Sequence, residues 1–185
     1  KRIGMLTSGG DCQSLNATMR GVVKGLNVLE GTVEIYGFID GYKGLIYGNY
    51  KRLTSQDFSG ILTTGGTILG TSRQPFKLMR TPDENGLDKV KAMKNNYRKY
   101  KLDCLVVLGG NGTHKTANML REEGLNVVTL PKTIDNDLWG TEMEMLSNGI
   151  PCPYEEYLDI YTTAFGTQVS DRIHFLGEAP AAAEL

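Results

Sequence analysis

The chain has 185 residues, of which 40% are hydrophobic and 22% charged, and its formal net charge at pH 7 is −1. This length and composition are typical of one globular domain with a sizeable core. The near-neutral charge and the lack of a dense Lys/Arg cluster argue against nucleic-acid binding, and no apolar run is long enough for a membrane helix.

Three cysteines, Cys12, Cys104 and Cys152, stand far apart in the sequence. An odd number of widely spaced cysteines favours reduced thiols, and therefore a cytoplasmic location. The chain opens with KRIGMLTSGG, which has no signal-peptide pattern, and this supports the same expectation.

The first predicted unit consists of a strand, a glycine turn and a helix. Residues 3–6 form a short apolar run, a Gly-Gly-Asp turn follows at 9–11, and residues 14–29 carry apolar side chains at helical spacing. A second strand is predicted at 33–38, and the glycine-punctuated stretch 37–44 is expected to be a loop.

A glycine- and hydroxyl-rich segment at 60–73 precedes a charged helix predicted over 87–99. The most strongly patterned stretch of the chain comes next. An apolar strand at 105–108 meets a glycine turn, a helix is predicted over 114–123, and a further strand is predicted at 127–130.

This β-α-β-α order predicts an α/β fold, with a parallel sheet and helices on both faces in three αβα layers. Glycine pairs at 9–10, 65–66 and 109–110 follow apolar runs and would meet at the carboxyl edge of the sheet. Backbone N–H groups at such turns can bind phosphate. Neither GxxxxGK[ST] nor GxGxxG is present, so a P-loop and an NAD fingerprint are both unsupported.

Several side chains near these turns have two possible roles. Arg73 is either a surface residue or a clamp on phosphate oxygens. Asp135 and Asp137 are either a structural turn pair or a general base with a supporting carboxylate. Asn111 is either a turn former or a neutral oxygen ligand, and by itself it would hold Mg²⁺ weakly.

Taken together, these motifs resemble the phosphofructokinase family. The resemblance is carried by residues 7–23, 41–45, 63–76, 105–117 and 131–141. GGTILGTSR and PKTIDND are its most specific parts. It implies a Rossmann-like, nucleotide-binding N-terminal domain over 1–145, in an enzyme that transfers the γ-phosphoryl group of ATP to the 1-hydroxyl of fructose 6-phosphate. It also implies Mg²⁺ as cofactor and a homotetramer.

The resemblance also implies a role for each matched position. The nucleotide site would be formed by Gly10, Arg73, Gln74, Gly110, Asn111, Gly112 and Thr113. The sugar would lie beside Lys132, Thr133 and Asp135, with Asp135 as the base and Thr133 as a second catalytic residue. Asn111 and Asp137 would be metal ligands, and Asp137 and Asp11 would balance the charge of the site.

Two matched positions point to different phosphoryl donors. In the family, glycine at the position of Gly112 goes with ATP, whereas an acidic residue there goes with pyrophosphate. Lys132, in contrast, resembles the pyrophosphate-using and mixed branch. We give Gly112 more weight, because a carboxylate at this position would crowd and repel the nucleotide.

The last part of the chain, residues 146–185, is expected to be a helical segment. Its stretch 148–173 resembles a piece from near the family's C-terminus, which implies that the intervening sugar-phosphate half is lacking. Two alternatives to the ATP-dependent enzyme therefore stay open: a non-catalytic nucleotide-binding remnant and a pyrophosphate-dependent phosphofructokinase. NAD and lipid kinases also carry GG(D/N)GT, but they lack the other motifs.

Overall fold

The computed structural model describes residues 1–11 and 14–132. Five strands form one sheet in the order β3-β2-β1-β4-β5. The strands are β1 (Arg2–Ser8), β2 (Glu34–Phe38), β3 (Tyr50–Leu53), β4 (Cys104–Gly109) and β5 (Val127–Pro131). The helices are α1 (Ser14–Glu30), α2 (Tyr42–Tyr47), α3 (Lys89–Lys99) and α4 (Asn111–Glu122), with short 3₁₀ turns η1 (Ile61–Thr63) and η2 (Phe76–Leu78).

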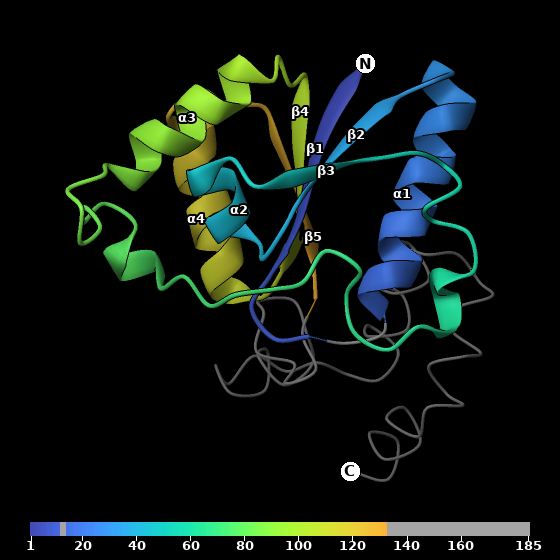
Figure 1. The fold of residues 1–185 in the computed structure, drawn as a ribbon, viewed down its shortest axis with the longest axis horizontal. Helices are drawn as coiled ribbons and strands as arrows, with labels where there is room; N and C mark the ends of the chain where they lie inside the picture. Colours follow the sequence, from blue (N-terminus) through green and yellow to red (C-terminus); the bar gives the residue numbers. More distant parts are fainter. Residues whose placement is uncertain (12–13, 133–185) are drawn as a thin grey trace, which may run out of the picture. The chain divides into compact units, whose positions relative to one another are not determined.

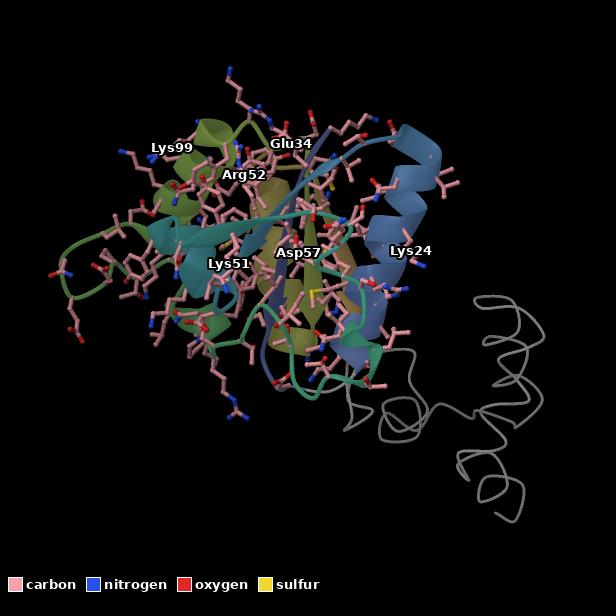
Figure 2. The ribbon with its side chains drawn as sticks, turned by 45° about the vertical axis from the view of Figure 1, so that its right-hand side comes forward. Lys24, Glu34, Lys51, Arg52, Asp57 and Lys99 are labelled. Atoms are coloured by element: carbon pink, nitrogen blue, oxygen red, sulfur yellow. The ribbon has the colours of Figure 1, made fainter. Side chains whose placement is uncertain are left out.

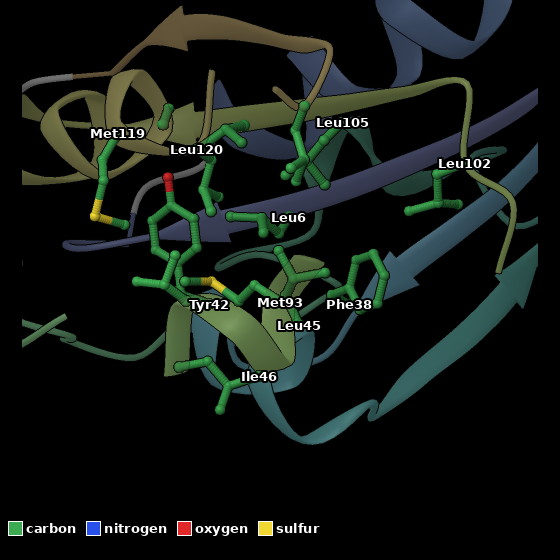
Figure 3. Close-up of a cluster of buried hydrophobic side chains, with 14 of the residues drawn as sticks. Leu6, Phe38, Tyr42, Leu45, Ile46, Met93, Leu102, Leu105, Met119 and Leu120 are labelled. Carbon is green, nitrogen blue, oxygen red and sulfur yellow. The ribbon is translucent and has the colours of Figure 1, made fainter. Parts of the chain in front are cut away.

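Helices cover both faces of the sheet, with α1 on one side and α2, α3 and α4 on the other (Figure 1). Because side chains alternate along a strand, neighbouring residues of β1 enter different cores. Met5 packs in the core with α1, whereas Leu6 packs in the core beneath α2 to α4 (Figure 3). The predicted three-layer αβα fold is confirmed.

The sheet is mixed rather than wholly parallel. Strands β2, β1, β4 and β5 run parallel to one another, but β3 pairs antiparallel with β2 at the edge. Strand β3 was not predicted, because its four residues, YKRL, lack an apolar run. Figure 2 shows two of its side chains, Lys51 and Arg52, which are exposed charges of the kind that discourages edge-to-edge pairing.

The stretch 37–44, predicted as a loop, leads instead into helix α2. This helix has only six residues, and burial of Tyr42, Leu45 and Ile46 holds it in place. Gly44 is required inside it, because a Cβ there would collide with the backbone of Ile39. Tertiary packing therefore sets a helix that local propensity does not indicate.

Helix α4 begins at Asn111, three residues before the predicted start at His114. The predicted nucleotide residues Asn111, Gly112 and Thr113 therefore form the first turn of a helix rather than a loop. Within residues 1–11 and 14–132, the remaining predicted helices and strands occur within two residues of their expected bounds, whereas the predicted helical segment 146–185 lies outside the described residues.

No helix within residues 1–11 and 14–132 is both long and apolar enough to cross a bilayer. Cys104 is a free, half-buried thiol, and burial raises its pKa above the usual range. Cys12, Cys152 and the predicted division between residues 1–145 and 146–185 lie outside the described residues.

Candidate functional site

The carboxyl ends of three neighbouring strands lie in one row. Ser8 of β1 pairs with Gly109 of β4, and Gly109 pairs with Pro131 of β5. In the sheet, β2 lies on one side of β1, whereas β4 and β5 lie on its other side. The boundary between β1 and β4 is therefore the topological switch point, where open α/β sheets bind their ligands.

The residues that follow this row lie close together. Gly9 has a φ of +90°, and a Cβ on it would lie 3.7 Å from Thr113 Oγ1. A Cβ on Gly10 would lie 3.2 Å from Lys132 Nζ, and one on Gly110 would lie 3.6 Å from the Lys132 carbonyl oxygen. The turn after β1, the start of α4 and the residue after β5 thus lie side by side at this edge of the sheet.

The amino end of α4 has no side-chain cap. Gly110 is the N-cap residue and supplies no side-chain acceptor, and the first turn contains no acidic side chain. The first-turn N–H groups of a helix lack intrahelical partners, and the helix dipole gives this end a partial positive charge. With the ammonium group of Lys132 nearby, the arrangement favours an anion such as phosphate.

The third glycine turn, Gly65–Gly66, joins the same edge. A Cβ on Gly66, whose φ is +73°, would lie 2.9 Å from Asp11 Oδ2. Asn16 fixes this turn: its Nδ2 donates to the carbonyl oxygens of Thr64 at 3.1 Å and Gly66 at 2.6 Å.

Sequence reasoning missed the role of Asn16. The available signal was a polar residue at a core-facing position of α1, where its neighbours Leu15 and Met19 are buried. Its side chain is completely buried, and burial of an amide requires hydrogen-bond partners.

Hydroxyl groups tie the segment before Arg73 to the end of β1. Thr7 Oγ1 donates to the Gly70 carbonyl oxygen at 2.8 Å, and Thr71 Oγ1 donates to the Gly9 carbonyl oxygen at 2.7 Å. Ser72 Oγ donates to the Asp40 carbonyl oxygen at 2.6 Å. These bonds fix residues 70–72, which directly precede the predicted phosphate clamp, Arg73.

Arg73 is exposed, and its guanidinium forms no hydrogen bond or ion pair with another residue in the part of the chain that the structure describes. Gln74, the other predicted nucleotide residue on this segment, is half-buried. A guanidinium without an ion-pair partner can bind phosphate oxygens without first breaking an ion pair.

Two partly or fully buried side chains support the first turn of α4. The Tyr42 hydroxyl donates to the Thr113 carbonyl oxygen at 2.8 Å, and burial raises the pKa of Tyr42 far above its usual range. His114 Nε2 lies 2.9 Å from the Gly109 carbonyl oxygen, so Nε2 carries the proton in this bond. Burial of this imidazole lowers its pKa.

The structure brings together the predicted nucleotide residues Gly10, Gly110, Asn111, Gly112 and Thr113, with Lys132 beside them. Thr133, Asp135 and Asp137 lie outside the described residues, so the predicted base and sugar-facing residues have no geometry here. Within the described ranges, no three side chains of His, Cys, Asp or Glu gather as a metal-binding cluster.

A family model described as Phosphofructokinase matches residues 2–147. An ATP-dependent 6-phosphofructokinase of Spirochaeta thermophila is 50% identical over 186 aligned residues, which cover 97% of this chain and 46% of that protein. A second relative with the same name, from Propionibacterium freudenreichii, is 52% identical over 141 residues, covering 76% of this chain and 37% of that protein. The crystal structure of Pichia pastoris phosphofructokinase in the T-state matches with a TM-score of 0.64 and 34% identity over 77% of this chain and 16% of that chain.

The chain spans about half, or less, of the length of the curated relatives that it matches. The aligned span of 186 residues in the Spirochaeta relative is nearly equal to the 185 residues of this chain. An alignment of this length has no room for a long gap, and it gives no support to a missing half inside the chain.

Proposed function

This chain belongs to the phosphofructokinase family, and we propose that the protein transfers the γ-phosphoryl group of ATP to the 1-hydroxyl of fructose 6-phosphate, giving fructose 1,6-bisphosphate. Within it, the described residues supply the nucleotide-binding side. The names of the two relatives support ATP as donor and 6-phosphofructokinase as activity.

One observation carries the nucleotide assignment: the uncapped start of α4 at the switch point, with Lys132 and Gly10 beside it. Phosphoryl transfer needs little covalent chemistry from the protein and depends on positioning and on neutralising charge. Backbone N–H groups, an ammonium group and the free guanidinium of Arg73 are the groups suited to that task.

The space at Gly112 supports ATP over pyrophosphate. A Cβ placed there would meet no atom within 4 Å, so this position opens into free space. The rest of a nucleotide can pass an exposed glycine, whereas a carboxylate there would repel it. The position of Lys132 beside Gly10 keeps pyrophosphate as the alternative donor, since an ammonium group can bind either donor.

The oxygen donors at this edge fit a Mg²⁺ ion that arrives with the nucleotide. Asp11 and Asn111 are exposed there, and they are too few to form a protein cage. Mg²⁺ in kinase sites is held by one or two carboxylates, water and the substrate phosphates, so such a sparse set suffices. When bound, Mg²⁺ would neutralise phosphate charge; Asn111 is the described candidate ligand, and Asp137 is the proposed second one.

On the acceptor side, we assign Asp135 as the base that takes the proton from the sugar hydroxyl, with Thr133 beside the sugar. The proposal rests on PKTIDND, in which Asp135 follows Lys132 by three residues. Lys132 follows β5 directly, at the carboxyl edge of the sheet.

We further propose that the protein is cytoplasmic and forms a homotetramer, and that residues 1–145 and 146–185 are separate parts of it. The free thiol of Cys104 is consistent with a reducing compartment. Sedimentation velocity of the purified chain would test the tetramer, and a monomer at micromolar concentration would contradict it for this chain.

The activity is tested by coupled assays for product formation from fructose 6-phosphate, first with ATP and then with pyrophosphate. We expect turnover with ATP, and Asp135→Asn should abolish it with little change in ATP affinity. Turnover with pyrophosphate alone would favour the alternative donor. Nucleotide binding without turnover by either donor would favour the non-catalytic remnant, and retained activity in Asp135→Asn would remove the base role.

A further inference from the structure

Thr71 forms a hydrogen bond that none of the sequence patterns indicated: its hydroxyl donates to the Gly9 carbonyl oxygen at 2.7 Å. This carbonyl belongs to the peptide unit that joins Gly9 to Gly10. A trans peptide is planar, and its C=O and N–H point to opposite sides. With the carbonyl directed to Thr71, the Gly10 N–H points away from the segment that carries Thr71.

The orientation of the Gly9–Gly10 peptide plane depends on such a hydrogen bond, because the two glycines do not fix that orientation themselves. Rotating a peptide plane changes ψ of the residue before it and φ of the residue after it, and both residues here are glycine. Gly9 already has a φ of +90°. Without a Cβ on either side, both orientations are sterically open.

The Gly10 N–H has no acceptor among the described residues, and Gly10 is exposed. Lys132 Nζ lies 3.2 Å from the position that a Cβ on Gly10 would occupy, so an ammonium group lies beside this residue. An unpaired N–H, an ammonium group and the uncapped first turn of α4 together suit an anionic ligand.

We infer that Thr71 is a positioning residue, whose hydroxyl fixes the Gly9–Gly10 peptide so that the Gly10 N–H is available to a phosphate oxygen of the donor. This inference rests on the proposed function for the identity of the ligand. The orientation of the peptide, however, is a property of the ligand-free protein and can be measured without any donor.

Three variants separate this role from general support of the segment. Thr71→Val removes the hydroxyl at nearly constant shape, and Thr71→Ser keeps it. Thr7→Val is the matched control, because Thr7 Oγ1 donates to the Gly70 carbonyl oxygen of the same segment at 2.8 Å but forms no hydrogen bond with the Gly9–Gly10 peptide. Thermal unfolding of each variant reports the loss of stability separately from the loss of binding.

The ligand-free measurement is the carbonyl ¹³C shift of Gly9 and the amide shift of Gly10 in isotope-labelled chain. We expect Thr71→Val to move both signals and Thr71→Ser and Thr7→Val to leave them near wild type. Unchanged Gly9 and Gly10 signals in Thr71→Val would overturn the inference, whatever the chain binds.

The ligand measurement is calorimetric titration with Mg·ATP and, separately, with Mg·pyrophosphate. Loss of one N–H bond to a charged phosphate should weaken binding about tenfold in Thr71→Val, and Thr71→Ser should restore it. An equal loss of affinity in Thr7→Val would overturn the inference, since support of the segment alone would then explain the effect. If wild type binds neither probe, the proposed function fails together with the phosphate contact, while the Gly9 and Gly10 signals still decide the orientation of the peptide.

Discussion

Two glycines at the junction of β4 and α4, Gly109 and Gly112, differ in the space around them. A Cβ on Gly109 would lie 2.5 Å from the Ser8 carbonyl oxygen and 2.6 Å from Thr113 Oγ1, so strand pairing itself requires glycine there. Gly112, in the first turn of α4, has open space. The first glycine therefore serves the fold, and the second is available to a ligand.

Substituting the two glycines should give opposite results. Gly109→Ala forces β1 and β4 apart and should lower the free energy of unfolding by about 1–3 kcal/mol. Gly112→Ala should leave it unchanged or raise it by up to about 1 kcal/mol, since alanine is the better helix former. Urea unfolding measures both, and a larger loss in Gly112→Ala than in Gly109→Ala would contradict the packing described here.

His114 should make stability depend on pH near neutrality. Its native pKa lies below the usual 6.5, because burial penalises the charged imidazole. The unfolded chain then binds the proton more readily, so this contribution is complete above pH 6.5 and is lost as pH falls through the native pKa. In His114→Gln, whose side-chain amide can still donate to the Gly109 carbonyl oxygen, the unfolding midpoint should vary less with pH over this window. An identical pH profile in wild type and variant would contradict the shift.

At the scale of elements, the main strands and helices could be predicted because the strands are apolar runs, the helices carry apolar residues at helical spacing, and glycine turns lie between them. Strands β1, β2, β4 and β5 and helices α1 and α3 follow this pattern. The missed elements, α2 and β3, are short and polar or contain glycine, and only contacts with distant residues stabilise them. Local sequence does not encode such contacts.

The same limit applies to the candidate site: its glycine turns could be predicted from the sequence, whereas its long-range hydrogen bonds could not. Glycine turns mark where backbone can approach a ligand, so Gly10 and Gly110 could be found from their place after strands. The hydrogen bonds of Asn16 and Thr71 span 50 and 62 residues of sequence, respectively, and are visible only once the chain has folded.

The N-cap residue of helix α3 allows a test of a local sequence signal that stabilises the fold. Asp88 is its N-cap residue, and its carboxylate accepts the Lys91 N–H at 3.0 Å. Asp88→Ala should lower the free energy of unfolding by about 0.5–2 kcal/mol, because one N–H of the first turn loses its acceptor. Lys91→Ala is the control, since it keeps both the cap and the capped N–H. Equal unfolding curves for wild type and Asp88→Ala would show that the cap contributes nothing.

At the scale of the whole molecule, the described residues form a three-layer αβα unit whose candidate site residues gather at one edge of the sheet. Strand order places β1 beside β4, and strand register aligns their ends, so turns about 100 residues apart in sequence become neighbours. The donor side of the proposed reaction can therefore be studied in this chain directly, by binding, even where turnover requires further residues.

The most direct test of a nucleotide site at the start of α4 is calorimetric titration of the chain with Mg·ATP, in wild type and in Gly112→Asp. We predict that wild type binds ATP and that the added carboxylate at the first turn of α4 weakens binding by about tenfold or more, through like-charge repulsion of the phosphates. Thermal unfolding should show that the variant remains folded. Absence of ATP binding in wild type, or equal affinity in the folded variant, would contradict a nucleotide site at the start of α4.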